Sequence, residues 1–289
     1  MEEVIFLIIL GGIWLLAASL QDIKTREIPN WLSLSLIFFA LGGRFFYVLF
    51  NETSGFFESA GFFYQGLMGF GIFVVLGYAF YYGRIFAGGD AKLFIALGAV
   101  LGFSGVFYDN IKIYGLFVFG VFLIGAVYGF AWSGYVCCKN FKDFKKRFKQ
   151  QLKGKKTFIR IFVFLGIILI FLGFYREMFF VFGFFFVSFP LIYFYAKSVD
   201  DACMIKEVSV DRLTEGDWLF NEIKIGNNKT LKPNWEGLSS DEIKEIQKNH
   251  KRIKIREGVP FVPVFLMSFF LTCWIYFSGF FDKFLWLLF

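Results

Sequence analysis

Residues 4–20 read VIFLIILGGIWLLAASL, a run without one charged side chain. A transmembrane helix needs about 20 mostly apolar residues to cross roughly 30 Å of hydrocarbon. Similar runs recur, and we expect crossings at residues 4–20, 31–50, 60–83, 90–108, 111–136, 158–174, 178–196 and 259–281. The run from Asp90 is short and contains glycine, so it can also end before a full crossing. The sequence therefore predicts an all-α polytopic membrane protein with six to eight transmembrane helices.

The composition excludes an ordinary soluble domain, because 57% of the 289 residues are hydrophobic and the mean hydropathy is +0.62. The net charge of +7 does not indicate nucleic-acid binding, since the basic residues fall between the apolar runs. We expect membrane lipid as a partner and no nucleic acid. We also expect no metal and no cofactor, because the cysteines and the single histidine lack the spacing of a zinc site. These residues are Cys137, Cys138, Cys203, Cys273 and His250.

The basic residues also predict the orientation in the membrane. When the connections between the runs are assigned to alternate sides, one side receives all but four of the 30 Lys and Arg residues. Cytoplasmic loops carry an excess of Lys and Arg. We therefore expect a multi-pass protein of the plasma membrane with its N-terminus outside. The four exceptions are Arg44, Lys112, Arg176 and Lys283.

The same pattern divides the chain into five segments. We expect a membrane core at residues 1–136, a basic interfacial segment at 137–157, a transmembrane hairpin at 158–197, a small cytoplasmic α+β domain at 198–257 and a C-terminal transmembrane helix at 258–289. The basic segment carries Phe141, Phe144 and Phe148 at helical spacing, which is typical of a helix lying on lipid phosphates.

Two features support a folded domain at 198–257. The stretch GDWLFNEIKIGNNKTLKP, residues 216–233, reads as short strands around a Gly-Asn turn. Ser239 and Glu242 have the spacing of a capping box at the start of a helix. The segment contains no pair of nucleophile and base, so we expect a structural or substrate-docking role.

Two aspartates stand at the edges of apolar runs. Asp22 lies in LQDIKTREIPNWL and Asp90 lies in FAGGDAKLF. A carboxylate at the edge of hydrocarbon is costly and usually has a function, and the expected orientation places both at the cytoplasmic face. Two carboxyl groups within hydrogen-bond reach share one proton. The ionised one can then take a proton from water while the other polarises a peptide carbonyl.

The expected helix ends suggest how the two carboxyl groups divide this work. Asp22 follows the C-terminal end of its helix, where the dipole disfavours negative charge, whereas Asp90 stands at an N-terminal end. We therefore expect Asp22 to hold the shared proton and Asp90 to act as the base, with support from Lys92 if its side chain turns back. Gly88 and Gly89 allow an extended peptide to approach the backbone closely.

These residues resemble a known family. Asp22 with Ile28-Pro29-Asn30, and the stretch Gly88-Gly89-Asp90-Ala91-Lys92-Leu93, are similar to the motifs of the type IV prepilin peptidases, membrane aspartyl proteases of the GxGD class. Within this family the archaeal preflagellin peptidases look most similar. The resemblance covers roughly residues 1–130 and extends to 198–257 and to GVPFVP at 258–263. It implies that Asp22 and Asp90 are the catalytic residues. Ala87 departs from the pattern, since the family has a glycine there.

The resemblance also implies a substrate. Family members cleave precursors of archaeal flagellins (archaellins) or type IV pilin-like proteins, which carry a short basic leader ahead of a hydrophobic helix. Bacterial relatives also methylate the new N-terminus and carry an insertion with paired CxxC motifs. This chain reaches Asp22 with no room for that insertion, so we expect no methyltransferase activity and no zinc. Glu27 is a candidate to engage the leader, although it can equally pair with Lys24.

The main alternative is a proton- or ion-coupled transporter that uses the two aspartates as a relay. Transport sites usually lie near the bilayer midplane on broken helices, often between inverted repeats. Here both acids are expected at one face, and the two halves of the sequence show no repeat. A third interpretation is a membrane scaffold for a surface filament.

Overall fold

The computed structural model describes residues 2–50, 56–225 and 229–278. The chain forms two compact units, Met1–Gly129 with Val259–Phe289 and Phe130–Gly258. Six of the described helices are long and apolar enough to cross a membrane, which confirms the predicted fold class. They are Glu2–Thr25, Asn30–Phe50, Gly61–Tyr82 within a longer helix, Phe107–Lys139, Lys156–Gly173 and Met178–Cys203.

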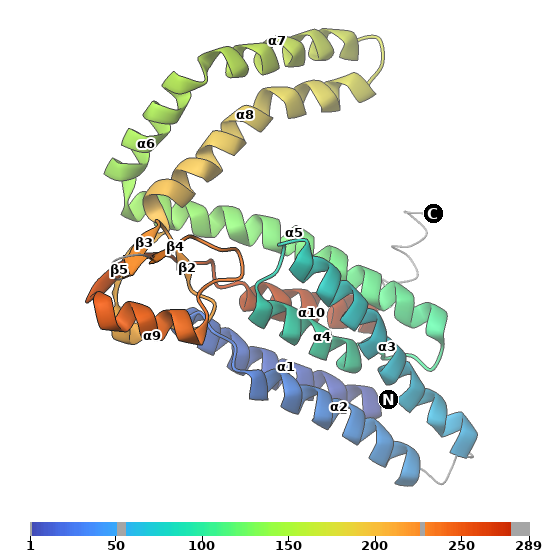
Figure 1. The fold of residues 1–289 in the computed structure, drawn as a ribbon. Coiled ribbons are helices and arrows are strands. Elements are labelled where there is room, and N and C mark those ends of the chain that lie inside the picture. Colours follow the sequence, from blue (N-terminus) through green and yellow to red (C-terminus); the bar gives the residue numbers. More distant parts are fainter. Residues whose placement is uncertain (1, 51–55, 226–228, 279–289) are drawn as a thin grey trace. The chain divides into compact units, whose positions relative to one another are not determined.

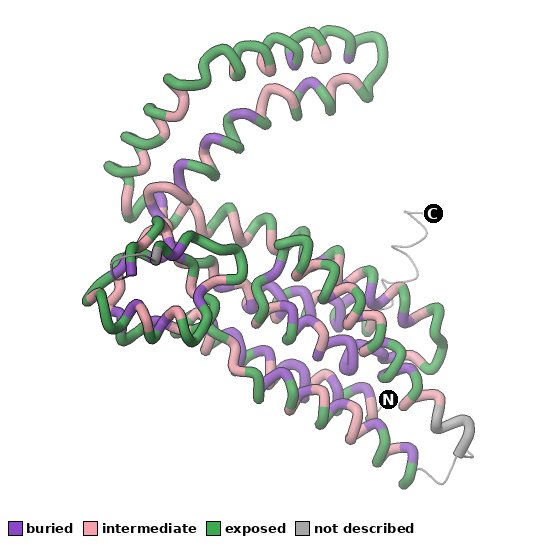
Figure 2. Tube along the Cα trace, viewed as in Figure 1, coloured by how far each residue is buried: buried purple, intermediate pink, exposed green. Residues whose placement is uncertain are grey.

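The first unit is helical, and its long helices lie side by side around a short one (Figure 1). Its elements are α1 (Glu2–Thr25), α2 (Asn30–Phe50), α3 (Phe56–Tyr82), α4 (Gly88–Val100), the start of α5 (Phe107–Lys139) and α10 (Val262–Phe277). Buried residues gather on α1, α4 and α10 (Figure 2). α4 is buried along most of its length, as expected of a helix that is apolar on every side.

The expected crossing at 90–108 is not a continuous helix. α4 has 13 residues, which gives a length of about 20 Å, too short for roughly 30 Å of hydrocarbon. Residues 101–106 then form no helix, although Leu101 and Phe103 are buried. Irregular backbone at membrane depth is tolerated only where protein groups satisfy its hydrogen bonds. The end of α4 therefore needs polar partners.

Arg44 supplies several of these partners. The sequence analysis counted Arg44 among the connections, but the structure places it inside α2 with no exposed surface. Its Nε donates to the Ala99 carbonyl at 3.0 Å, and its Nη2 donates to the carbonyls of Val100 and Gly102 at 3.1 and 2.8 Å. The guanidinium thus caps carbonyls that have no partner within α4, at the end where the helix dipole favours a cation. Gly66 of α3 leaves room for it, because a Cβ there would collide with the arginine.

A second polar cluster holds the rest of the irregular segment. Asn110 Nδ2 donates to the Gln65 side chain at 3.0 Å and to the Ser104 carbonyl at 2.7 Å, and Asn110 Oδ1 accepts the Ser104 N–H at 2.9 Å. Gln65 Nε2 donates to the Gly105 carbonyl at 3.3 Å. Side chains from α3 and α5 thereby replace the hydrogen bonds that a longer helix would make.

α3 and α4 approach each other backbone to backbone. A Cβ added to Gly98 would lie 2.6 Å from the carbonyl oxygen of Gly69 and 2.5 Å from the side chain of Phe73. Small residues at such contacts allow the close packing that holds helices together in lipid. This contact holds α4 against α3. Arg44 binds the C-terminal end of the same short helix.

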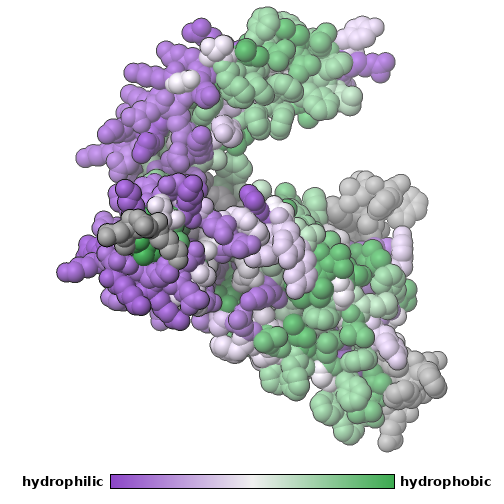
Figure 3. Space-filling view, viewed as in Figure 1, coloured by the Kyte–Doolittle hydropathy of each residue, from purple (hydrophilic) through white to green (hydrophobic). Residues whose placement is uncertain are grey.

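The second unit contains the end of α5, a helical hairpin and a small mixed domain. Its helices are α6 (Phe141–Gly154), α7 (Lys156–Gly173), α8 (Met178–Cys203) and α9 (Ser240–Asn249). α7 and α8 pack through Gly166 and Gly183, where a Cβ on Gly183 would lie 2.8 Å from the Gly166 carbonyl. In the segment expected to be interfacial, α6 has no buried residue, but Phe144 packs its ring on Tyr195 of α8. Hydrophilic residues gather on α6 and the small domain, and apolar residues on the hairpin (Figure 3).

The small domain has the predicted mixture of strands and helix. β1 (Ile205–Ser209), β5 (Arg252–Arg256) and β2 (Trp218–Leu219) form an antiparallel sheet in the order β1-β5-β2, and β3 (Ile223–Ile225) pairs with β4 (Lys229–Leu231). A 3-10 turn follows β1 at Val210–Arg212. The predicted capping box is confirmed, since Ser239 and Glu242 bond reciprocally at the start of α9. The expected turn at 226–228 and the end of the last crossing, 279–289, lie outside the described residues.

Replacing the buried arginine by methionine (Arg44→Met) leaves the carbonyls at the end of α4 without donors. We expect the free energy of unfolding in detergent micelles to fall by about 3 kcal/mol, because each unsatisfied buried carbonyl costs on the order of 1–3 kcal/mol. Arg44→Lys should recover only part of the loss, since an ammonium cannot reproduce the planar fork of donors. Denaturant titration measures both.

Arg176→Met is the matched control, because Arg176 is exposed between α7 and α8. It should change the free energy of unfolding by no more than about 0.5 kcal/mol. If Arg44→Met were as stable as Arg176→Met, the guanidinium would not be what holds the end of α4.

Candidate active site

Asp22 lies in the last turn of α1 and is 5% exposed. The sequence predicts a position just past the end of this helix, which is wrong by one turn. The helix continues to Thr25 and ends where Arg26 adopts a left-handed backbone with φ 63°. The Arg26 N–H still donates to the Asp22 carbonyl at 2.9 Å, so the backbone of Asp22 belongs to the helix.

The side chain of Asp22 meets the start of a helix from the other end of the chain. The Val262 N–H donates to Asp22 Oδ2 at 3.0 Å. Phe261 is the N-cap of α10 and Val262 is its first residue. The first N–H groups of a helix have no partner within it, and the helix dipole there favours an anion. Asp22 thus caps α10.

This contact changes the electrostatic setting that the sequence suggested for Asp22. The C-terminal dipole of α1 disfavours its charge, but the N-terminal dipole of α10 and the Val262 N–H favour it. Oδ2 accepts an N–H, which makes Oδ1 the favoured position for a proton on Asp22. Which of the two aspartates holds a shared proton stays a prediction.

Asp90 is the third residue of α4 and is partly buried. It lies close enough to Asp22 for the two charges to repel each other. The positive charge of Arg26 also acts on the Asp22 carboxyl group. The charges of Arg26 and Asp22 both act on the hydroxyl of Tyr128 in α5. The end of the first unit that carries the α1–α2 connection therefore gathers two carboxyl groups, a guanidinium and a phenol.

The two sequence motifs around the aspartates contact each other twice. Gly89 faces Ile28, since a Cβ on Gly89 would lie 3.3 Å from the Cβ of Ile28. Lys92 Nζ donates to Asn30 Oδ1 at 2.7 Å. The structure thus directs Lys92 to the first residue of α2. A Cβ added to Gly88, the first residue of α4, would lie 3.7 Å from the Tyr81 ring, which is an ordinary contact distance.

Glu27 is exposed in the connection between α1 and α2. Among the described residues, no ion pair joins it to Lys24, the partner that the sequence offered. Its side chain is therefore open to solvent on the same connection that follows Asp22.

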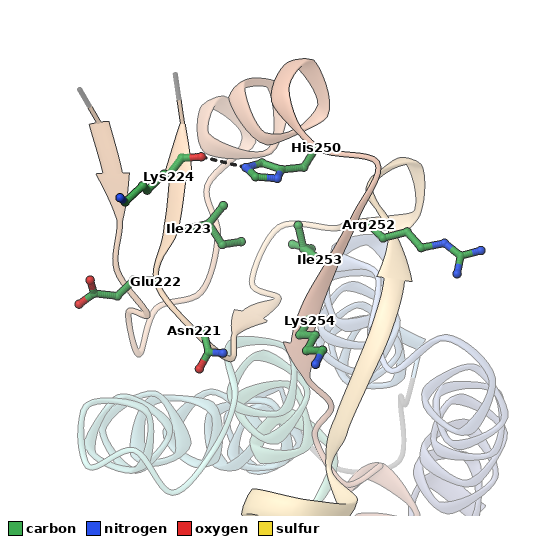
Figure 4. A pocket seen from close by; sticks show the side chains of 8 residues that line it. All are labelled: Asn221, Glu222, Ile223, Lys224, His250, Arg252, Ile253 and Lys254. Carbon is green, nitrogen blue, oxygen red and sulfur yellow. Dashed lines mark hydrogen bonds between the residues drawn. The ribbon is translucent and has the colours of Figure 1, made fainter. Parts of the chain in front are cut away.

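The small domain of the second unit carries a pocket of about 280 Å³. Figure 4 shows Ile223 and Ile253 beside the open space, whereas the charged ends of Glu222, Lys224 and Arg252 point away from it. His250 Nε2 lies 2.9 Å from the Lys224 carbonyl. Polar groups do not converge there as a binding site requires. Within the described part of the chain, no group of three or more His, Cys, Asp and Glu residues could hold a metal.

Comparison with known proteins bears on the first unit. Residues 9–130 match the family model of the type IV leader peptidase family. The match includes Asp22, Asp90 and the motifs around them, which confirms the resemblance seen in the sequence. It ends at the first residue of the second unit and does not include α10. Comparisons with curated proteins and with solved structures found no match.

The contact between Asn30 and Lys92 can be measured by a double-mutant cycle with Asn30→Ala and Lys92→Ala. We expect a coupling energy of about 1 kcal/mol in the free energy of unfolding, because the hydrogen bond has a charged donor but is exposed to solvent. Asn30→Ala with Lys24→Ala is the control, and its two effects should add. Equal coupling in both cycles would mean that Lys92 does not bind Asn30.

Proposed function

We propose that this chain, through its type IV leader peptidase domain, is a membrane aspartyl endopeptidase of the GxGD class. It removes the short basic leader from preflagellin (archaellin) or type IV pilin-like precursors. One observation supports this most: the two aspartates of the matched segment lie close enough for their charges to repel each other. No other pair of carboxyl groups among the described residues combines this proximity with the family's motifs.

Hydrolysis needs one carboxyl group in each protonation state. The ionised aspartate takes a proton from a water molecule, whose oxygen attacks the carbonyl carbon of the scissile peptide bond. The protonated aspartate donates to the carbonyl oxygen, and the leaving nitrogen then takes a proton as the bond breaks. Asp22 and Asp90 can share these roles because like charges at close range do not both ionise easily.

The cytoplasmic face of the plasma membrane is the proposed location of this chemistry. Arg44 was one of four basic residues that opposed the predicted orientation, and it lies inside α2 rather than in a connection. Its removal from the count strengthens the charge asymmetry, with the N-terminus outside. A substrate with a basic leader in the cytoplasm and a hydrophobic helix in the bilayer would reach Asp22 and Asp90 from this side. In this proposal the exposed Glu27 engages the basic leader.

The proposed activity is peptidase activity alone, without methyl transfer, zinc or another cofactor. The proposal rests on the sequence, which lacks the paired CxxC motifs of the bacterial relatives. Transport by an aspartate relay is the weaker candidate. Asp22 and Asp90 both lie in end turns of their helices, whereas transport sites are usually built near the midplane.

Replacing either aspartate by asparagine should abolish the reaction. With purified protein in liposomes and an archaellin precursor as substrate, we expect Asp22→Asn and Asp90→Asn each to lower kcat/KM at least about 1,000-fold, because neither half of the acid–base pair works alone. Leader release is measured by mass spectrometry. In the same assay Glu27→Gln should raise KM and leave kcat unchanged.

Asp109→Asn is the matched control, because Asp109 also lies in the first turn of a helix, α5, where it pairs with Lys112 at 3.4 Å. It should cleave at the unaltered rate. Full activity in Asp22→Asn or Asp90→Asn, or solute flux without cleavage, would overturn the proposed function. An unchanged KM in Glu27→Gln would remove Glu27 from the leader site.

A further inference from the structure

We propose that the first turn of α10 is a positioning element for the candidate dyad, in which the backbone N–H of Val262 holds the Asp22 carboxyl group in place. The inference rests on the proposed function for its catalytic meaning. α10 lies outside the segment that matches the family model, 9–130, so the match assigns it no role.

Few backbone N–H groups in the first turn of α10 are available to Asp22. Pro263 has no N–H, and the Val264 N–H bonds to the Phe261 carbonyl at 2.9 Å. The Val262 N–H, the first of the helix, donates to Asp22 Oδ2 at 3.0 Å. Proline is favoured in the first turn of a helix and fixes its backbone. The sequence of this turn therefore presents a preformed donor to Asp22.

The same turn reaches the segment that carries Asp90. The ring of Phe261 lies 5.7 Å from the ring of Phe86, and the ring of Phe265 lies 5.4 Å from it. Phe86 is buried and stands four residues before Asp90. Phe261, the neighbour of the Val262 donor, thus packs its side chain against the approach to Asp90.

Close packing leaves Phe261 little freedom to move. A Cβ on Gly125 of α5 would lie 3.0 Å from the end of the Phe261 ring. Val262 has no exposed surface. A shift of this turn would therefore move the Val262 N–H away from Asp22 and the Phe261 ring away from Phe86. We infer that α10 sets the separation of the two carboxyl groups.

The decisive change is to remove one N–H and leave every side chain intact. Replacing Val262 by its α-hydroxy acid, introduced at a suppressed stop codon, turns its peptide N–H into an ester oxygen. We expect kcat for leader removal to fall at least about tenfold with KM unchanged, because hydrogen bonds to charged groups are among the strong ones. The limb of the pH profile that Asp22 controls should move to higher pH, since a donor to its carboxylate is lost.

The matched control is the same α-hydroxy acid at Val264. Both valines are fully buried in the first turn of α10, but the Val264 N–H bonds to a carbonyl and not to Asp22. This variant should keep the pH profile. An equal loss of kcat in the two esters would mean that α10 acts only through helix stability, which would overturn the inference. An unchanged kcat in the Val262 ester would also overturn it.

A second measurement separates this inference from the proposed function. Infrared difference spectra between the protein and its Asp22→Asn variant isolate the bands of the Asp22 carboxyl group. The Val262 ester should shift these bands and the Val264 ester should not, whether or not any precursor is cleaved. A protein that shows the shift but cleaves no precursor would keep the contact and lose the proposed function. Unshifted bands in the Val262 ester would overturn the contact itself.

Discussion

The hydrogen bond from the Val262 N–H to Asp22 is the contact on which the candidate site depends. Asp22 stands in the last turn of α1, where a negative charge is disfavoured by the helix dipole, and it is almost fully buried. A carboxyl group in that position is stable only with donors around it. The N-terminus of α10 provides such a donor, so a residue at the unfavourable end of one helix lies at the favourable end of another.

α4 has the same kind of arrangement at both of its ends. Asp90 stands in its first turn, where helix donors favour an acid, and Arg44 binds the carbonyls at its last turn. A helix of this length cannot cross a bilayer by itself. Arg44, Gln65 and Asn110 allow it to end inside the protein, and its short length places Asp90 at the end of the first unit where Asp22 lies. The short helix α4 thus carries a candidate catalytic residue, Asp90, in its first turn and is held by Arg44 at its last turn.

Much of this could be predicted from the sequence because the signals are local. Uncharged runs give the crossing helices, Ser239 and Glu242 give the capping box, and the short run after Asp90 already suggested an incomplete crossing. The contacts that hold the site are not local. Val262 lies 240 positions from Asp22, and the carbonyls that Arg44 binds at the end of α4 lie more than 50 positions away from it. Neither pair produces a pattern of spacing, and an arginine in an apolar run looks like a residue of a connection.

The most direct test of the paired carboxyl groups uses a precursor peptide whose scissile amide is replaced by a hydroxyethylene group. The hydroxyl imitates the tetrahedral intermediate that a dyad of aspartates forms from water and substrate. If Asp22 and Asp90 act together, this peptide should bind at least about 100-fold more tightly than the same peptide with an uncleavable reduced amide. Asp22→Asn and Asp90→Asn should each remove the difference. Equal affinity for the two peptides, or a difference that survives in either variant, would contradict a water-activating pair at this site.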